Sequence, residues 1–156
     1  MLILEKLNSR YTLSPRLKAY LGVCYYHDWN FRLATQIMDA VMPQLKVFAP
    51  QERSIYYWVN AESHFNQQHY TQAIPLYESM TLVCKTNEKG DAFYKMGMCY
   101  LQENRLEPAS ECLSSALAYY KSYRKTDRRA RERQIKTMLK GIKDRLKGIK
   151  APLQGQ

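Results

Sequence analysis

Two similar runs of the chain bring a glycine, a cysteine and a tyrosine close together, a combination that could serve chemistry or packing. The runs are LGVCYYHDWNFRLA at residues 21–34 and MGMCYLQENRLEPA at residues 96–109. They indicate either two copies of a chemical motif or one structural unit that is repeated. The first interpretation would make the chain an enzyme or a metal protein, and the second would make it a binding scaffold.

The cysteines do not have the spacing of metal ligands. A zinc site needs several converging ligands, usually in pairs at short spacing, and the four cysteines form no CxxC pair. A buried cysteine behaves as a small hydrophobic residue. We therefore expect Cys24 and Cys99, which occupy the same place in the two runs, to be packing residues, and we expect neither a metal ion nor a cofactor.

The residue types of common catalytic sites are present, but they are not arranged as a site. The three histidines form no metal-binding pair on a helix face, and the acidic residues are scattered rather than paired. No GxSxG, Walker-type loop or dinucleotide-binding glycine cluster occurs. The sequence therefore predicts a protein that is not an enzyme, with His64 as a core residue.

Small residues recur along the chain with bulky residues at fixed distances from them. Gly22, Ala61 and Gly97 are spaced by 39 and 36 residues, and an alanine follows each of them twelve residues later. Small residues let two helices approach closely, and bulky residues at helical spacing fill the surrounding space. The pattern predicts three helix-turn-helix units. The bulky residues three before and four after each alanine are Phe31, Tyr70, Leu106, Met38, Tyr77 and Leu113.

These columns resemble the tetratricopeptide repeat, whose signature is an aromatic residue, then Leu, Gly and Tyr, and later an Ala and a further aromatic residue. The resemblance covers residues 14–120, at spacings longer than the usual period of the family. It implies an all-α fold, a right-handed superhelix of three antiparallel helix pairs followed by a long basic C-terminal helix. The matching residues are Leu21, Gly22, Tyr25, Phe31, Ala34 and Met38, then Tyr57, Ala61, Phe65, Tyr70, Ala73 and Tyr77, then Phe93, Met96, Gly97, Tyr100, Ala109, Leu113 and Ala116.

The expected organisation is one repeat domain with short extensions at both ends. Its parts are a lead-in segment at 1–13, helical hairpins at about 14–48, 51–85 and 88–120, a basic capping helix at 124–150 and a tail at 151–156.

The resemblance implies that one face of each first helix lies on the concave side of the superhelix. That face is rich in aromatic and apolar residues, the types that dominate interface energetics, which favours binding of a peptide or helix from another protein. The alternative is that some of these side chains pack against the C-terminal helix of the same chain. The candidate partner-binding residues are Tyr26, Trp58, Glu62, Phe65, Asn66, Tyr94, Met98, Leu101 and Gln102.

The net charge of +10 arises near the C-terminus, because residues 121–150 contain 13 of the 24 Lys/Arg and three of the 14 Asp/Glu. Apolar residues in this segment follow one helical stripe, which predicts a helix that caps the last repeat. An acidic partner is the second possibility. Nucleic acid or an anionic membrane is less favoured, because no aromatic residue follows Tyr123 to stack on bases. The stripe is Ile135, Met138, Leu139, Ile142, Leu146 and Ile149, and the basic surface is Arg128, Arg129, Arg131, Arg133, Lys136, Lys140 and Lys143.

These features together predict a non-catalytic protein–protein interaction module, an adaptor or scaffold. Two alternatives stay open. One is a regulatory peptide sensor, since the long Tyr-rich units resemble the repeat domains of Gram-positive pheromone sensors; the other is a small secretion chaperone of the tetratricopeptide type.

No apolar run approaches the roughly 18 residues of a membrane span, and the start MLILEKLN is too short for a secretory signal. We expect a cytoplasmic protein, and the sequence is compatible with a homo-oligomer.

Overall fold

The computed structural model describes residues 2–3, 5–6, 13–123 and 128–150. The regular structure in these ranges is helical, without a strand, which confirms the all-α prediction. The chain divides into two compact units, Met1–Cys84 and Lys85–Gln156, each with a hydrophobic core. Most of the predicted lead-in, the first residues of the predicted basic helix (124–127) and the tail at 151–156 lie outside the described residues.

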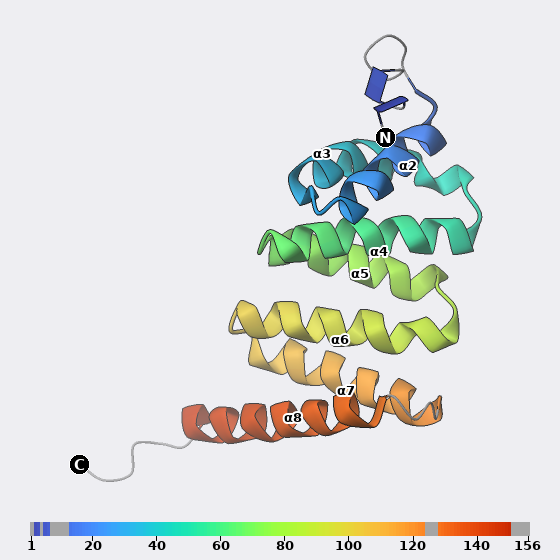
Figure 1. Ribbon diagram of the computed structural model, residues 1–156. Helices are drawn as coiled ribbons and strands as arrows, with labels where there is room; N and C mark the ends of the chain where they lie inside the picture. The colour runs from blue at the N-terminus through green and yellow to red at the C-terminus, as the bar shows by residue number, and fades with distance from the viewer. Residues whose placement is uncertain (1, 4, 7–12, 124–127, 151–156) are drawn as a thin grey trace. The chain divides into compact units, whose positions relative to one another are not determined.

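The first unit consists of two helical hairpins and a short connection (Figure 1). In each hairpin the two helices pack along one another. The hairpins are α2 (Pro15–His27) with α3 (Phe31–Val41), and α4 (Pro50–Asn66) with α5 (Tyr70–Val83), joined by the 3-10 helix η1 (Met42–Val47).

Polar caps determine where the first two helices begin. The Ser14 hydroxyl accepts a hydrogen bond from the Leu17 backbone N–H at 3.4 Å, and Pro15 occupies the first helical position, where an N–H is not needed. Asn30 caps α3 in the same way, with 3.3 Å from the Leu33 N–H to its Oδ1. These caps satisfy backbone donors that would otherwise lack a partner at the start of each helix.

The second unit contains one hairpin, α6 (Thr86–Gln102) with α7 (Leu106–Ser122), and the long helix α8 (Arg129–Lys150), which packs against α7 (Figure 1). Ile135 and Ile142 of α8 are buried in a cluster with residues of α6 and α7. The predicted stripe therefore faces the hairpin. Its last member differs, since Ile149 is 73% exposed, beyond the point where α8 side chains join the cluster.

The small residues of the repeat are points of close helix approach. A methyl group added at Gly97 would lie 2.7 Å from Cγ of Leu113 on the partner helix. The equivalent methyl group at Gly22 would collide with the side chain of Met38. Leu113 and Met38 occupy the same column of the repeat, so both hairpins close in the same way.

All three hairpins also use the same turn. Trp29, Gln68 and Asn104 each follow the small residue of their repeat by seven positions, and each has a left-handed backbone with φ of 61°, 62° and 57°. In the first turn the Trp29 N–H donates to the Tyr26 carbonyl at 3.0 Å, and the next N–H, that of Asn30, donates to the Tyr25 carbonyl at 2.9 Å. The other two turns repeat both hydrogen bonds, which together form the Schellman motif.

Candidate binding site

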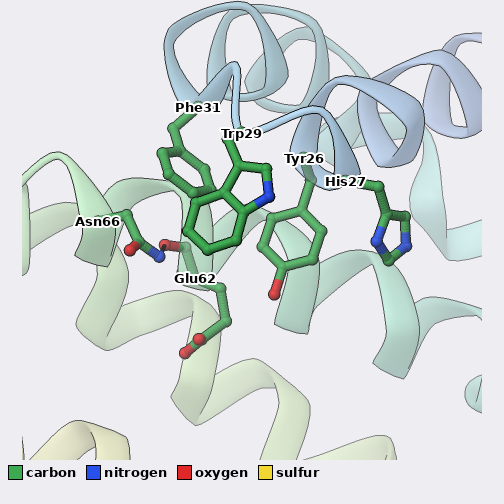
Figure 2. Close-up of a pocket in the computed structure, with 6 residues that line it drawn as sticks. All are labelled: Tyr26, His27, Trp29, Phe31, Glu62 and Asn66. Carbon is green, nitrogen blue, oxygen red and sulfur yellow. Dashed lines mark hydrogen bonds between the residues drawn. The ribbon is translucent and has the colours of Figure 1, made fainter.

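A pocket of about 290 Å³ lies in the first unit where the first hairpin meets α4. The end of α2, the turn and the start of α3 supply the aromatic part of its wall, and α4 supplies the polar part (Figure 2). Its lining residues are Tyr26, His27, Trp29, Phe31, Glu62 and Asn66. Tyr26, Glu62 and Asn66 are three of the residues predicted to bind a partner.

The aromatic rings of the pocket contact one another in series, with Phe31 between Tyr26 and Trp29. The Tyr26 and Phe31 ring centroids are 6.0 Å apart, and those of Trp29 and Phe31 are 6.1 Å apart with the planes at 62°. Such tilted and edge-on contacts are favourable for aromatic rings and hold them in place. Figure 2 shows the three rings grouped, with Glu62 and Asn66 approaching from α4.

Trp29 is the most exposed part of this group, at 79%. Its position comes from the turn, because the left-handed backbone and the two Schellman hydrogen bonds direct the residue away from the hairpin core. The sequence analysis did not select Trp29 or Phe31 as binding residues. A signal was present, since the alignment places Trp29 in one column with the polar residues Gln68 and Asn104.

Glu62 gives the pocket a carboxylate that is only 8% exposed. It accepts a hydrogen bond from the Tyr77 hydroxyl of α5, which holds it in place. Burial raises the pKa of Tyr26, and the negative charge of Glu62 raises it further, so Tyr26 stays a neutral phenol at physiological pH. The Nδ2 of Asn66 donates to the backbone carbonyl of Glu62 at 2.7 Å. The pocket therefore combines neutral rings with one fixed acidic group.

Two further predicted residues of the first unit are half-buried between α4 and α5. Trp58 contacts Tyr77 edge-on at 5.7 Å between ring centroids, and Phe65 contacts Tyr70 in the same manner at 5.4 Å. Both rings keep part of their surface accessible. They extend the aromatic surface of α4 beyond the pocket.

His64 is buried on α4, as predicted, and belongs to a polar cluster. Asp39 of α3 accepts a hydrogen bond from Asn60 at 2.8 Å and lies 3.0 Å from Nε2 of His64. Burial alone would raise the pKa of Asp39, but its hydrogen bonds with His64 and Asn60 outweigh that effect and hold the pKa below its usual value. This cluster ties α3 to α4 and so fixes the helices that carry the pocket.

In the second unit a different arrangement surrounds the predicted residues. Tyr94 is 8% exposed, and the Arg131 guanidinium lies 4.6 Å from its ring centroid. Met98 and Leu101 are half-buried against the cluster that includes Ile135 and Ile142, while Gln102 is exposed at the end of α6. Tyr94 therefore contacts the C-terminal helix of the same chain through Arg131, and Met98 and Leu101 pack against the cluster to which that helix contributes Ile135 and Ile142.

Acidic and aromatic groups of this unit hold Arg131 of α8 and Arg128, which directly precedes that helix. The Tyr120 hydroxyl donates to Asp91 at 2.5 Å, and Arg128 and Arg131 approach the Asp91 carboxylate at 3.6 Å and 3.4 Å. The Arg128 guanidinium also lies 5.0 Å from the Tyr120 ring centroid. Burial raises the pKa of Tyr120 above its usual value, and the hydrogen bond to Asp91 raises it further.

The predicted basic surface therefore separates into two groups. Arg128 and Arg131 are engaged with α6 and α7 of their own unit. The remaining members, Arg129, Arg133, Lys136, Lys140 and Lys143, are exposed on α8.

The described residues contain neither a metal-binding cluster nor a membrane-spanning helix. In those ranges no group of three or more His, Cys, Asp or Glu is placed to hold a metal ion. Cys99 is buried and Cys24 half-buried, and neither is part of a disulfide among the described residues. None of the helices in the same ranges is both long enough and apolar enough to cross a membrane.

No model of a known protein family matches the sequence, and no curated protein sequence matches it. Solved structures do share its fold. The type III secretion chaperone SycD of Yersinia enterocolitica, in complex with a peptide of the translocator YopD, is 17% identical with a TM-score of 0.66, over 83% of this chain and 92% of that chain. PcrH of Pseudomonas aeruginosa, in complex with the chaperone-binding region of PopD, is 21% identical with a TM-score of 0.65, over 86% of this chain and 96% of that chain.

A third structure, the apo form of RapI, is 12% identical with a TM-score of 0.65, over 92% of this chain but 54% of that chain. The fold is that of tetratricopeptide-like helical repeats. This confirms the resemblance that the repeated columns indicate.

Proposed function

We propose that this chain is a non-catalytic protein that binds a segment of a partner protein against the aromatic surface of its first unit. The observation that carries the proposal is the pocket, which is lined by an exposed tryptophan, two further rings and a largely buried glutamate. Aromatic residues that are exposed and held rigid are typical anchors of protein interfaces. The structures of SycD and PcrH, each with a bound segment of another protein, support this use of the fold.

The more specific candidate is a secretion chaperone that holds a protein before export. The match extends over 92% of the SycD chain and 96% of the PcrH chain, but over 54% of the RapI chain. The match therefore spans nearly all of the two chaperone chains and about half of the RapI chain. A chaperone of this kind works in the cytoplasm, and the exposed basic face of α8 is suited to an acidic stretch of its partner.

The proposal can be tested with peptides selected from a random display library against the full chain. The enriched peptides are then titrated by fluorescence polarisation, and we expect micromolar dissociation constants. Trp58→Ala combined with Phe65→Ala removes two aromatic groups of α4 and is expected to weaken binding about tenfold or more.

The matched control is Leu82→Ala, which truncates a side chain on α5 that is 82% exposed and is expected to leave binding unchanged. Thermal melting establishes that each variant is folded at the assay temperature. Failure to enrich any peptide, or equal binding by the double variant and the control, would contradict the proposed function.

A further inference from the structure

The first hairpin turn differs from the other two at the position that is hardest for a large residue. A left-handed backbone is unfavourable for side chains in general, but Asn and similar short polar residues tolerate it best. The third turn has such a residue, Asn104, whereas the second has the longer polar residue Gln68 and the first has the bulky Trp29. Since Trp29 is 79% exposed, burial of its side chain does not compensate for this strain.

The same hairpin region has a second departure from the repeat. The residue after the small Gly or Ala is Val23 in the first repeat and Met98 in the third, but Glu62 in the second. Burial of a carboxylate is unfavourable unless polar or charged partners compensate for the lost water. Glu62 is 8% exposed and accepts a hydrogen bond from the Tyr77 hydroxyl, so a carboxyl group lies where the other two repeats have an apolar side chain.

Both departures meet in one place, because Trp29 and Glu62 line the same pocket together with Tyr26 and Phe31 (Figure 2). Strained or unfavourable residues that cluster in this way are a recognised indication of function. The chemistry they provide is also specific. Aromatic faces attract cations, most strongly at tryptophan, and a nearby carboxylate adds an opposite charge in a partly desolvated place.

The second unit shows this chemistry already in use within the chain. Arg131 lies over the Tyr94 ring at 4.6 Å and 3.4 Å from the Asp91 carboxylate, so one guanidinium has both an aromatic face and an acid. Asp91 and Tyr94 are three residues apart on α6, whereas the pocket of the first unit assembles its rings and its acid from α2, the turn, α3 and α4.

We infer that the pocket formed by Tyr26, Trp29, Phe31 and Glu62 binds the cationic side chain of a lysine or arginine of the partner segment. This inference rests on the proposed function and adds the side-chain chemistry that the site selects. An uncharged side chain of similar length would make the ring contacts but would lose the attraction to the carboxylate. The pocket therefore discriminates by charge.

The test begins with a pair of small probes, Ac-Gly-Arg-Gly-NH2 and the same peptide with citrulline, which has nearly the shape of arginine without its charge. The chain has two tryptophans, Trp29 and Trp58, so the indole N–H region of an NMR spectrum contains two signals. We expect the arginine probe to shift the Trp29 signal at millimolar concentration, while the citrulline probe leaves it unchanged. Trp58 is the internal control, and the Trp29→Asn variant assigns the signals.

Two variants separate recognition from folding. Glu62→Gln preserves the shape and an acceptor for Tyr77, and we expect it to remove the preference for arginine over citrulline. Trp29→Asn introduces the residue type of the third turn, so we expect a higher melting temperature. Because this variant lacks the Trp29 signal, its loss of arginine binding is measured from the backbone amide shifts of the remaining pocket residues. Gln68→Asn makes the equivalent change in the second turn, away from the pocket, and is expected to leave the response intact.

The same variants apply to peptides selected with the full chain. If such a peptide contains a basic residue, its replacement by citrulline or norleucine is expected to weaken binding by wild type about tenfold, and binding by Glu62→Gln much less. Equal responses of wild type to the arginine and citrulline probes would overturn the inference even if longer peptides bind. Conversely, an arginine response without enrichment of longer peptides would support the pocket and contradict the proposed function.

Discussion

The two units contain the same chemical groups, aromatic rings and a carboxylate, but in one unit these groups pack against α8 and in the other they line a pocket. In the second unit Asp91, Tyr94 and Tyr120 hold Arg131 of α8 and Arg128, which precedes that helix, so the cations come from the chain itself. In the first unit Glu62 and three rings line a pocket. The comparison teaches that the same groups can stabilise a fold or recognise a ligand. In the second unit they hold arginine side chains against the hairpin, and in the first unit they line a pocket.

The largest expected effect comes from weakening the packing of α8 against its hairpin, which would separate the arginines from the rings and the carboxylate of the second unit. Ile135→Asp places a carboxylate where the isoleucine is 0% exposed, and a buried unpaired charge should cost about 4 kcal/mol of unfolding free energy. Urea denaturation followed by far-UV circular dichroism measures this loss. Ile149→Asp, at a position 73% exposed in the same helix, should change the free energy by less than about 0.5 kcal/mol. Similar losses in both variants would show that α8 is not held by its stripe.

The next effect concerns the hairpin that carries Asp91 and Tyr94. Gly97→Ala would bring a methyl group to 2.7 Å from Leu113, and we expect a loss of about 1–3 kcal/mol from overpacking. At Gly141, by contrast, an added methyl group has no neighbour within 4 Å. Gly141→Ala should therefore stabilise the chain by up to about 1 kcal/mol through helix propensity alone. Thermal melts of both variants give the comparison, and stabilisation by Gly97→Ala would refute the close contact.

Replacing the acidic residue of each unit by its amide distinguishes a structural role from a binding role most directly. Asp91→Asn weakens a charged hydrogen bond from Tyr120 and two ion pairs, and should cost about 1–2 kcal/mol of stability. Glu62→Gln should change the unfolding free energy less, because Tyr77 keeps an acceptor, and should instead abolish the preference for a cation. Denaturation and probe titration of both variants provide the two measurements. If both variants lost stability equally, the carboxylates would have the same structural role.

The smallest effect concerns Asp39, whose pKa is held down in the folded state mainly by His64 and Asn60 against the effect of burial. A carboxyl group with a lower pKa in the folded chain stabilises it when ionised. That contribution is present above the unfolded pKa of about 4 and disappears as the pH falls through the folded value. We expect Asp39→Asn to reduce stability at neutral pH by at most about 1 kcal/mol, because the side chain is 52% exposed.

Denaturation curves recorded at several pH values measure this difference. Wild type and Asp39→Asn should converge as the pH falls below about 4. A difference between them that stays constant across that range would mean that the ionised carboxylate contributes nothing.

The sequence was informative where packing repeats and uninformative where one side chain is unusual. The columns of Gly22, Gly97, Met38 and Leu113 predict the hairpins, because close helix contacts require small residues opposite large ones. The stripe on α8 likewise predicts which face is buried, apart from Ile149. Those features depend on residue spacing within one or two helices, which is visible in the sequence.

The site depends on contacts between residues far apart in the chain. Nothing in the spacing of Arg131 indicates that it lies over Tyr94, because this depends on how α8 is placed along the hairpin. Glu62 was selected for its column, but its relation to Trp29 follows from the packing of α4 on the first hairpin. The strain at Trp29 is a backbone property that no residue pattern showed.

The shared turn has a consequence for how such a chain can change its specificity. Trp29, Gln68 and Asn104 occupy one backbone conformation fixed by backbone hydrogen bonds, and all three are exposed. A residue at this position can therefore be exchanged for roughly the cost of a left-handed backbone, about 1–2 kcal/mol, without repacking a helix. The scaffold thus offers exposed turn positions for recognition side chains, and a protein engineer could move the aromatic anchor from the first hairpin to the second by two substitutions. The third position differs, because Asn104 accepts a hydrogen bond from Arg145 of α8 at 2.6 Å.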